Sequence, residues 1–150
     1  MRPRNVTSTR PARASASEVW ELLADLHAWP DWAPVRSVEL ERPGDDEPHG
    51  VGAVRALRTI TGVTRERVTL VEAPHRQDYE LLSGLPVQDY RATVEVAPQP
   101  DGTCEIHWSS TFRSSWASYT LIRLAIPAFA RGLARAASRR AAPVVRSARS

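Results

Sequence analysis

A chain of 150 residues with 42% apolar and 25% charged residues can bury one substantial core, and this composition excludes a globally disordered protein. The basic residues are all arginines, with no lysine. Residues 106–150 contain eight arginines and no acidic residue, so this segment has a charge of +8. Because the net charge of the chain is +3, residues 1–105 have a charge of −5. The single cysteine, Cys104, excludes an intrachain disulfide and a thiolate metal cluster.

The N-terminal residues predict the location of the protein. They are basic, but no apolar stretch follows them, which argues against a secretory signal. No window of the sequence holds the roughly 18 uninterrupted apolar residues of a membrane-spanning helix. We therefore expect a cytoplasmic protein.

The first third of the chain predicts a strand followed by short helices. Residues 4–10 alternate weakly between apolar and polar, as in a strand. Ser15 and Glu18 have the spacing of a capping box, so a helix should start there. Trp29-Pro30 should stop this helix, because proline disfavours a helical residue before it, and residues 31–33 should form one further turn.

The middle of the chain predicts an antiparallel sheet. Short segments rich in β-branched and aromatic residues are separated by turn signals such as Thr61-Gly62 and Asp101-Gly102. Five or six strands joined by short turns favour a meander over a doubly wound sheet. The segments are 35–40, 53–59, 64–73, 77–83, 89–96 and 103–113.

The last third predicts a long amphipathic helix from about Ser118 to Arg140. Pro127 either kinks this helix or starts it, which would leave pieces 118–126 and 127–140. Beyond Pro143 we expect a frayed basic tail, residues 143–150. The face that we expect to be covered consists of Leu121, Leu124, Ala125, Ala128, Phe129, Gly132, Leu133 and Ala136.

Two charged residues fall on inward faces of the predicted sheet. Arg55 alternates with Leu57, and Glu66 alternates with Val68, so the two charges accompany apolar side chains. Counting outward from the turn at Thr61, they are nearly opposite each other. A buried charge is costly unless it is paired, which predicts an internal Arg55–Glu66 ion pair. Tyr79, Tyr90 and Trp108 add polar-tipped aromatics to the same interior, as in a ligand pocket.

These segments resemble the START/Bet v 1-like superfamily, and within it the bacterial polyketide cyclase/dehydrase-like lipid-binding branch. The resemblance covers about residues 4–140. It rests on residues 14–25, the Trp29–Trp32 turn, residues 50–55, residues 65–68, Tyr79, Pro86, Tyr90 and residues 108–112. It implies an α+β helix-grip fold: a curved antiparallel sheet of about seven strands wraps a long C-terminal helix, with two short helices after the first strand. Residues 1–142 would form one ligand-binding domain.

The resemblance also implies a function, the binding and transport of a hydrophobic small molecule or lipid between sheet and helix. The alternative is a cyclase, aromatase or dehydratase acting on a polyketide-like chain, with Arg55, Glu66, Tyr79 and Tyr90 as candidate catalytic residues. No metal site and no cofactor are expected. The ligand-binding candidates are Trp32, Arg55, Leu57, Glu66, Val68, Tyr79, Leu81, Tyr90, Trp108, Phe129 and Leu133.

Arg131, Arg135 and Arg139 form a stripe with four-residue spacing along the last helix. One interpretation is a solvated helix face, and the other is weak contact with an anionic membrane. Nucleic acid is not expected as a partner, because no aromatic residues interleave with the arginines to stack on bases. The sequence leaves the oligomeric state open.

Overall fold

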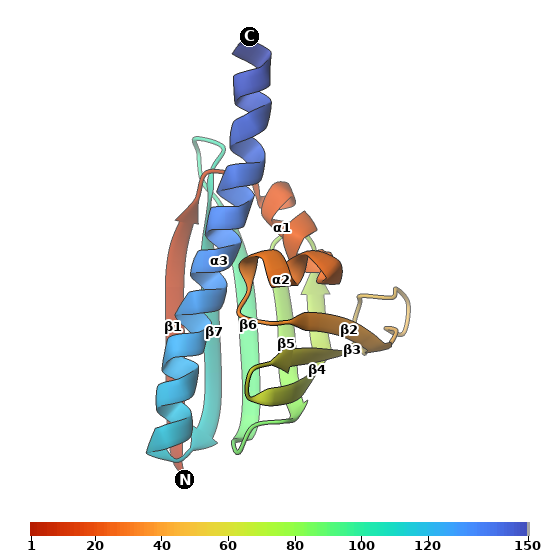
Figure 1. Ribbon diagram of the computed structural model, residues 1–150, viewed down its shortest axis with the longest axis vertical. Coiled ribbons are helices and arrows are strands. Elements are labelled where there is room, and N and C mark those ends of the chain that lie inside the picture. Colours follow the sequence, from red (N-terminus) through yellow and green to blue (C-terminus); the bar gives the residue numbers. More distant parts are fainter. Residues whose placement is uncertain (150) are drawn as a thin grey trace.

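The computed structural model describes the backbone of residues 1–149 and the side chains of residues 1–142. Seven antiparallel strands form one curved sheet, and a long helix packs along it (Figure 1). The strands are β1 (Arg2–Ala12), β2 (Ser37–Arg42), β3 (Val54–Thr59), β4 (Gly62–Glu72), β5 (Arg76–Ser83), β6 (Gln88–Pro98) and β7 (Cys104–Ser114). The helix-grip fold is therefore confirmed.

Strands β2 to β7 follow one another across the sheet as a meander, and β1 completes the sheet beside β7. The tight turns between consecutive strands determine which of their residues lie opposite each other. Gly62, with a φ of +130°, closes the β3–β4 hairpin at a conformation that favours glycine. The resulting register places Arg55 directly opposite Glu66, as the sequence predicts.

Short helices follow β1. Helix α1 (Ala16–Ala24) begins with the predicted capping box: the Ser15 hydroxyl accepts from the Glu18 amide, and the Glu18 carboxylate accepts from the Ser15 amide. The prediction that this helix runs to Trp29-Pro30 is wrong. Asp25 takes an extended conformation, and its carboxylate caps the 3-10 helix η1 (Leu26–Ala28) by accepting from the His27 amide. Pro30 then lies in the first turn of α2 (Trp29–Trp32), where its missing N–H costs nothing.

The long helix α3 (Trp116–Arg149) begins two residues before the predicted start and is continuous. Pro127 therefore lies inside it and does not start a helix. The predicted covered face is partly wrong, because 70% of Leu124 and 44% of Leu121 are exposed. Leu133 of the predicted face is buried, and the other buried apolar residues of the helix belong to the neighbouring row: Ile122, Ile126, Ala130, Ala134 and Ala137.

Gly132 lets α2 and α3 approach closely. A Cβ atom added to this glycine would collide with the carbonyl oxygen of Trp32, which is backbone and cannot rotate away. Gly132 therefore leaves no room for a ligand, since α2 already fills that space. The contact fixes α2 against the helix that the sheet grips.

None of the helices in the described part of the chain is long and apolar enough to span a membrane. The predicted basic tail, residues 143–150, lies outside the residues whose side chains are described, and it stays a prediction.

Candidate functional site

The main cavity lies between the sheet and the N-terminal half of α3, and has a volume of about 310 Å³. Carbon-rich side chains from the sheet and from α3 supply most of its walls, and Glu66 is the one charged residue among them. This composition suits an apolar molecule with few polar groups. The residues that line it include Leu57, Glu66, Tyr79, Tyr90, Trp108, Ala125 and Phe129.

Glu66 forms a buried ion pair with Arg55. The guanidinium Nε donates to Glu66 Oε1 at 3.2 Å, and only 4% of the Arg55 side chain and 10% of the Glu66 side chain are exposed. Among the described side chains, none donates a hydrogen bond to the second oxygen, Oε2. Because Glu66 lines the main cavity, its carboxylate borders the space that a bound molecule would occupy.

Arg55 is held in place from several sides. Its Nη1 donates to Gln77 Oε1 at 3.1 Å, and its guanidinium carbon lies 4.8 Å from the centre of the Trp29 ring and 4.9 Å from that of Tyr79. These cation–π contacts are strengthened by desolvation. Nη2 is buried and has no hydrogen-bond partner among the described residues. The arginine is therefore a fixed neutralising charge for Glu66.

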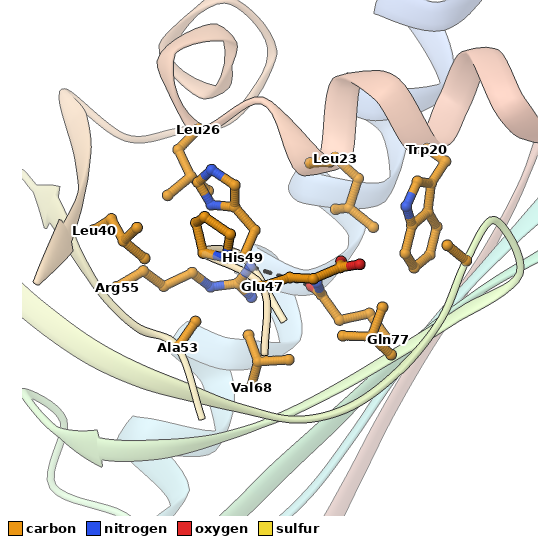
Figure 2. Close-up of a pocket in the computed structure, with 14 residues that line it drawn as sticks. Trp20, Leu23, Leu26, Leu40, Glu47, His49, Ala53, Arg55, Val68 and Gln77 are labelled. Atoms are coloured by element: carbon orange, nitrogen blue, oxygen red, sulfur yellow. Dashed lines mark hydrogen bonds between the residues drawn. The ribbon is translucent and has the colours of Figure 1, made fainter. Parts of the chain in front are cut away.

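A side cavity of about 290 Å³ lies on the other side of this ion pair, below the loop that joins β2 to β3. Figure 2 shows Arg55 and Gln77 at its base, with Trp20 and Leu23 from α1 above them and His49 from the loop across them. Arg55 and Gln77 line the side cavity, and Glu66 lines the main cavity. The ion pair thus belongs to the wall between two apolar spaces.

Burial controls the protonation of the polar groups in the main cavity. It raises the pKa of Glu66, and the Arg55 charge and hydrogen bond offset part of that rise. Burial also raises the pKa of Tyr90, and raises that of Tyr79 well above its usual value. Both tyrosines are therefore neutral hydroxyls at physiological pH. Glu66 is the one carboxyl group that lines this cavity, and its pKa lies above the usual carboxyl value.

Aromatic contacts fix the shape of the cavity wall. The Trp108 indole Nε1 donates to the Tyr79 hydroxyl at 3.0 Å, and this satisfies the buried indole donor. The Tyr79 and Tyr90 ring centres lie 6.5 Å apart, and those of Trp108 and Phe129 lie 5.5 Å apart. Such pairs lock the rings, so the cavity is preformed.

Most of the predicted ligand-binding residues come together in these two spaces. Arg55 and Val68 line the side cavity, whereas Trp32 and Leu133 are buried and line neither cavity. Whether any of these residues contacts a ligand stays a prediction. Those that line the main cavity are Leu57, Glu66, Tyr79, Leu81, Tyr90, Trp108 and Phe129.

Arg55 contacts Glu66, Tyr79, Gln77 and Trp29. The last two, Gln77 and Trp29, were not predicted from the sequence as site residues. Gln77 has a signal in the sequence: it precedes Tyr79 by two residues and therefore shares the inward face of β5. Trp29 has no such signal, because its place over Arg55 depends on how η1 and α2 pack on the sheet.

Comparisons with known proteins match this architecture. A family model described as polyketide cyclase / dehydrase and lipid transport matches residues 3–141. A comparison with curated proteins finds no match.

Solved structures share the fold at low sequence identity. The protein XoxI from Bacillus cereus is 23% identical, with a TM-score of 0.73 over 91% of this chain and 95% of that one. A protein of Thermobifida fusca is 25% identical, with a TM-score of 0.72 over 90% and 93% of the two chains. A point mutant of norcoclaurine synthase from Thalictrum flavum, solved with a transition-state analogue, is 19% identical, with a TM-score of 0.66 over 90% and 94%.

Proposed function

Because the chain belongs to the polyketide cyclase/dehydrase and lipid transport family, we propose that it binds and carries an apolar small molecule or lipid in the main cavity. The observation that carries this proposal is the cavity itself, a preformed apolar space of about 310 Å³ whose one charged lining residue, Glu66, has an oxygen that accepts no hydrogen bond from the described side chains. A cavity of this size lies at the lower end of the range for small-molecule sites.

The chemistry of Glu66 narrows the ligand class. A ligand hydroxyl or N–H group can donate to Oε2, and the pair with Arg55 keeps the net charge of the site at zero. A ligand carboxylate would meet Glu66 without a free cation, because Arg55 is already engaged. The ligand is therefore a neutral, largely apolar molecule with at least one hydrogen-bond donor.

We expect Ala125→Phe to weaken binding of N-phenyl-1-naphthylamine by about tenfold or more, a loss of about 1.4 kcal/mol. This neutral fluorescent probe has one N–H donor, and Ala125 lines the main cavity, so the added ring occupies the space of the probe. Fluorescence titration measures the affinity. Ala117→Phe is the matched control, because Ala117 is exposed on the same helix, and it should bind the probe as the unmodified protein does.

A second variant identifies which space holds the probe. Ala24→Leu adds bulk to the side cavity and should leave probe binding unchanged. If Ala24→Leu weakens binding and Ala125→Phe does not, the main cavity is not the site. Native mass spectrometry of the purified protein complements the titration, because a retained apolar molecule identifies the natural ligand class directly.

The raised pKa of Glu66 favours a second candidate function, catalysis of a cyclase-type or dehydratase-type reaction. Burial raises the pKa of this carboxyl, and a general acid or base works best with a pKa near the working pH. In such a reaction Glu66 would take a proton from the carbon between two ketone groups, leaving an enolate, and return it at another position. Tyr79 and Tyr90, both neutral, would serve as donors to the developing oxyanion.

Benzoylacetone, an apolar 1,3-diketone, tests this activity. We expect the protein to speed exchange of its central methylene protons in heavy water, observed by NMR, and Glu66→Gln to abolish the effect. The rate should rise as pH increases above 4.5 and level off past the raised pKa of Glu66, because only the carboxylate accepts a proton. Equal exchange with the variant, while the probe still binds, would leave binding as the sole function of the cavity.

A further inference from the structure

A groove lined by four arginines lies outside the two cavities. It runs between β1 and the middle of α3, which Figure 1 shows lying side by side, and has a volume of about 390 Å³. We call this surface the arginine groove. Its lining residues are Arg10, Pro11, Arg131, Ala134, Arg135, Ser138 and Arg139.

The four guanidinium groups come from two different elements. Arg131, Arg135 and Arg139 follow one another at four-residue intervals and thus form one row along α3. Arg10 lies on β1 opposite Ile106 of β7, and it shares the helix-facing side of that strand with buried Ser8. Strand and helix therefore direct positive charge toward one groove.

No carboxylate balances this charge. None of the residues that line the groove is acidic, and the chain has no acidic residue after Glu105. Within the described residues, the four arginines of the groove take part in no ion pair, whereas Arg65, Arg67 and Arg76 each pair with a carboxylate. Like charges held at this spacing repel each other, so an anion in the groove would relieve that repulsion.

Arg10 also carries an unsatisfied donor. Its Nε is buried and finds no hydrogen-bond acceptor in the part of the chain with described side chains. Arg4, six residues earlier on the same strand face, also has a buried Nε without a partner, but its guanidinium carbon lies 4.8 Å from the centre of the Tyr119 ring. Arg10 makes no comparable contact with a ring among the described residues. A buried donor without a partner is costly, which points to an acceptor supplied from outside the chain.

The geometry points to a phosphoryl group: we propose that the arginine groove binds the phosphate of a small, multiply charged anion. Several arginines on two sides of a groove suit phosphate, since guanidinium groups donate paired hydrogen bonds to its oxygens. The groove has no aromatic lining residue on which a nucleic-acid base could stack. This site is separate from the main cavity and does not depend on the function proposed for it.

A membrane surface fits the groove less well than a small anion. Among the described side chains of α3, the large exposed apolar ones are Trp116, Leu121 and Leu124, which lie near the start of the helix and before the groove arginines. Insertion of an interfacial helix into a bilayer needs apolar residues beside the basic ones. The groove offers only Pro11 and Ala134.

Inorganic pyrophosphate is the probe, and calorimetric titration of the full chain at low ionic strength measures its affinity. We expect Arg10→Gln and Arg135→Gln each to weaken binding by about fivefold or more, because each removes a direct donor to the phosphate. Arg123→Gln is the matched control: it removes the same charge from an exposed position on α3 outside the groove. Its affinity should stay within about twofold of the unmodified protein.

Three results would each decide the matter. If all three variants weaken pyrophosphate binding equally, the effect is one of general charge and the proposed site is refuted. The proposal is also refuted if the protein binds neither pyrophosphate nor vesicles. Vesicles of phosphatidylcholine with and without phosphatidic acid separate the two sources of phosphate. If only the phosphatidic acid vesicles bind, and Arg10→Gln but not Arg123→Gln abolishes this, the groove takes a lipid headgroup. Unchanged melting temperatures confirm that the variants fold.

Discussion

Replacing Arg55 with methionine is expected to lower the free energy of unfolding by about 3–5 kcal/mol. The change leaves the Glu66 carboxylate buried without its cation, and it also removes the donor to Gln77 Oε1. Methionine has a similar length, so the loss of packing against Trp29 and Tyr79 is small. Denaturant unfolding, followed by circular dichroism, measures the difference.

A second substitution separates the charge from the packing. Arg55→Met combined with Glu66→Met should recover most of the lost stability, because an apolar pair of similar volume replaces a buried ion pair at little or no cost. Arg65→Met is the control: it breaks the exposed pair with Glu41, whose side chains are 45% and 36% exposed, and should cost less than about 1 kcal/mol. A double variant as unstable as the single one would refute the electrostatic explanation.

Gly132→Ala should destabilise the protein by about 1–3 kcal/mol, the usual cost of overpacking. In an ordinary helix interior the same change is favourable by about 1 kcal/mol, because alanine is the better helix former. Here the added methyl group meets the Trp32 carbonyl oxygen, so α2 must move away from α3. The shift in denaturation midpoint, at an unchanged slope, reports the loss.

Arg123→Ala provides the comparison for Gly132→Ala. Arg123 is exposed on the same helix, and its replacement should change stability by less than about 0.5 kcal/mol. If Gly132→Ala proves neutral or stabilising, the close approach of α2 and α3 is not required by the fold. A change in the near-ultraviolet signal of the buried tryptophans would accompany the expected displacement of α2.

The Arg55–Glu66 pair is predictable from sequence because two short-range rules determine it. Alternation along a strand places both side chains on the inner face, and the turn near Thr61-Gly62 sets which residues are opposite. Because both side chains are buried, each charge needs the other as its partner. No long-range information enters this inference, and the structure confirms it.

The orientation of α3 is less accessible from sequence. The helix has two adjacent apolar rows, one containing Leu121 and Leu124 and the other containing Ile122 and Ile126. Periodicity identifies both rows equally well, but only the position of the sheet decides which row is buried. The sheet covers Ile122 and Ile126, so the other row lies at the edge of the main cavity, where Leu121 and Leu124 are partly exposed.

The close contact at Gly132 and the place of Arg10 in the arginine groove also depend on tertiary contacts, which the local sequence does not encode. A glycine in a helix pattern has no local signal that tells a close backbone approach from an opening for a ligand. Arg10 lies more than 120 residues before the arginines that it joins. Only the pairing of β1 with β7, and the packing of α3 beside β1, bring these charges together.

The place of β1 in the sheet has a consequence for how the chain folds. Strands β2 to β7 pair with their neighbours in sequence and can form as each hairpin is synthesised, but β1 must wait for β7, which begins at Cys104. The entropy of closing so long a loop is overcome only late, and contacts of high sequence separation slow folding. Until then Arg2–Ala12 and the open edge of the growing sheet are both available to other chains. Strand β1 is thus the last strand to join the sheet. Aggregation during synthesis is most favoured before β1 pairs with β7.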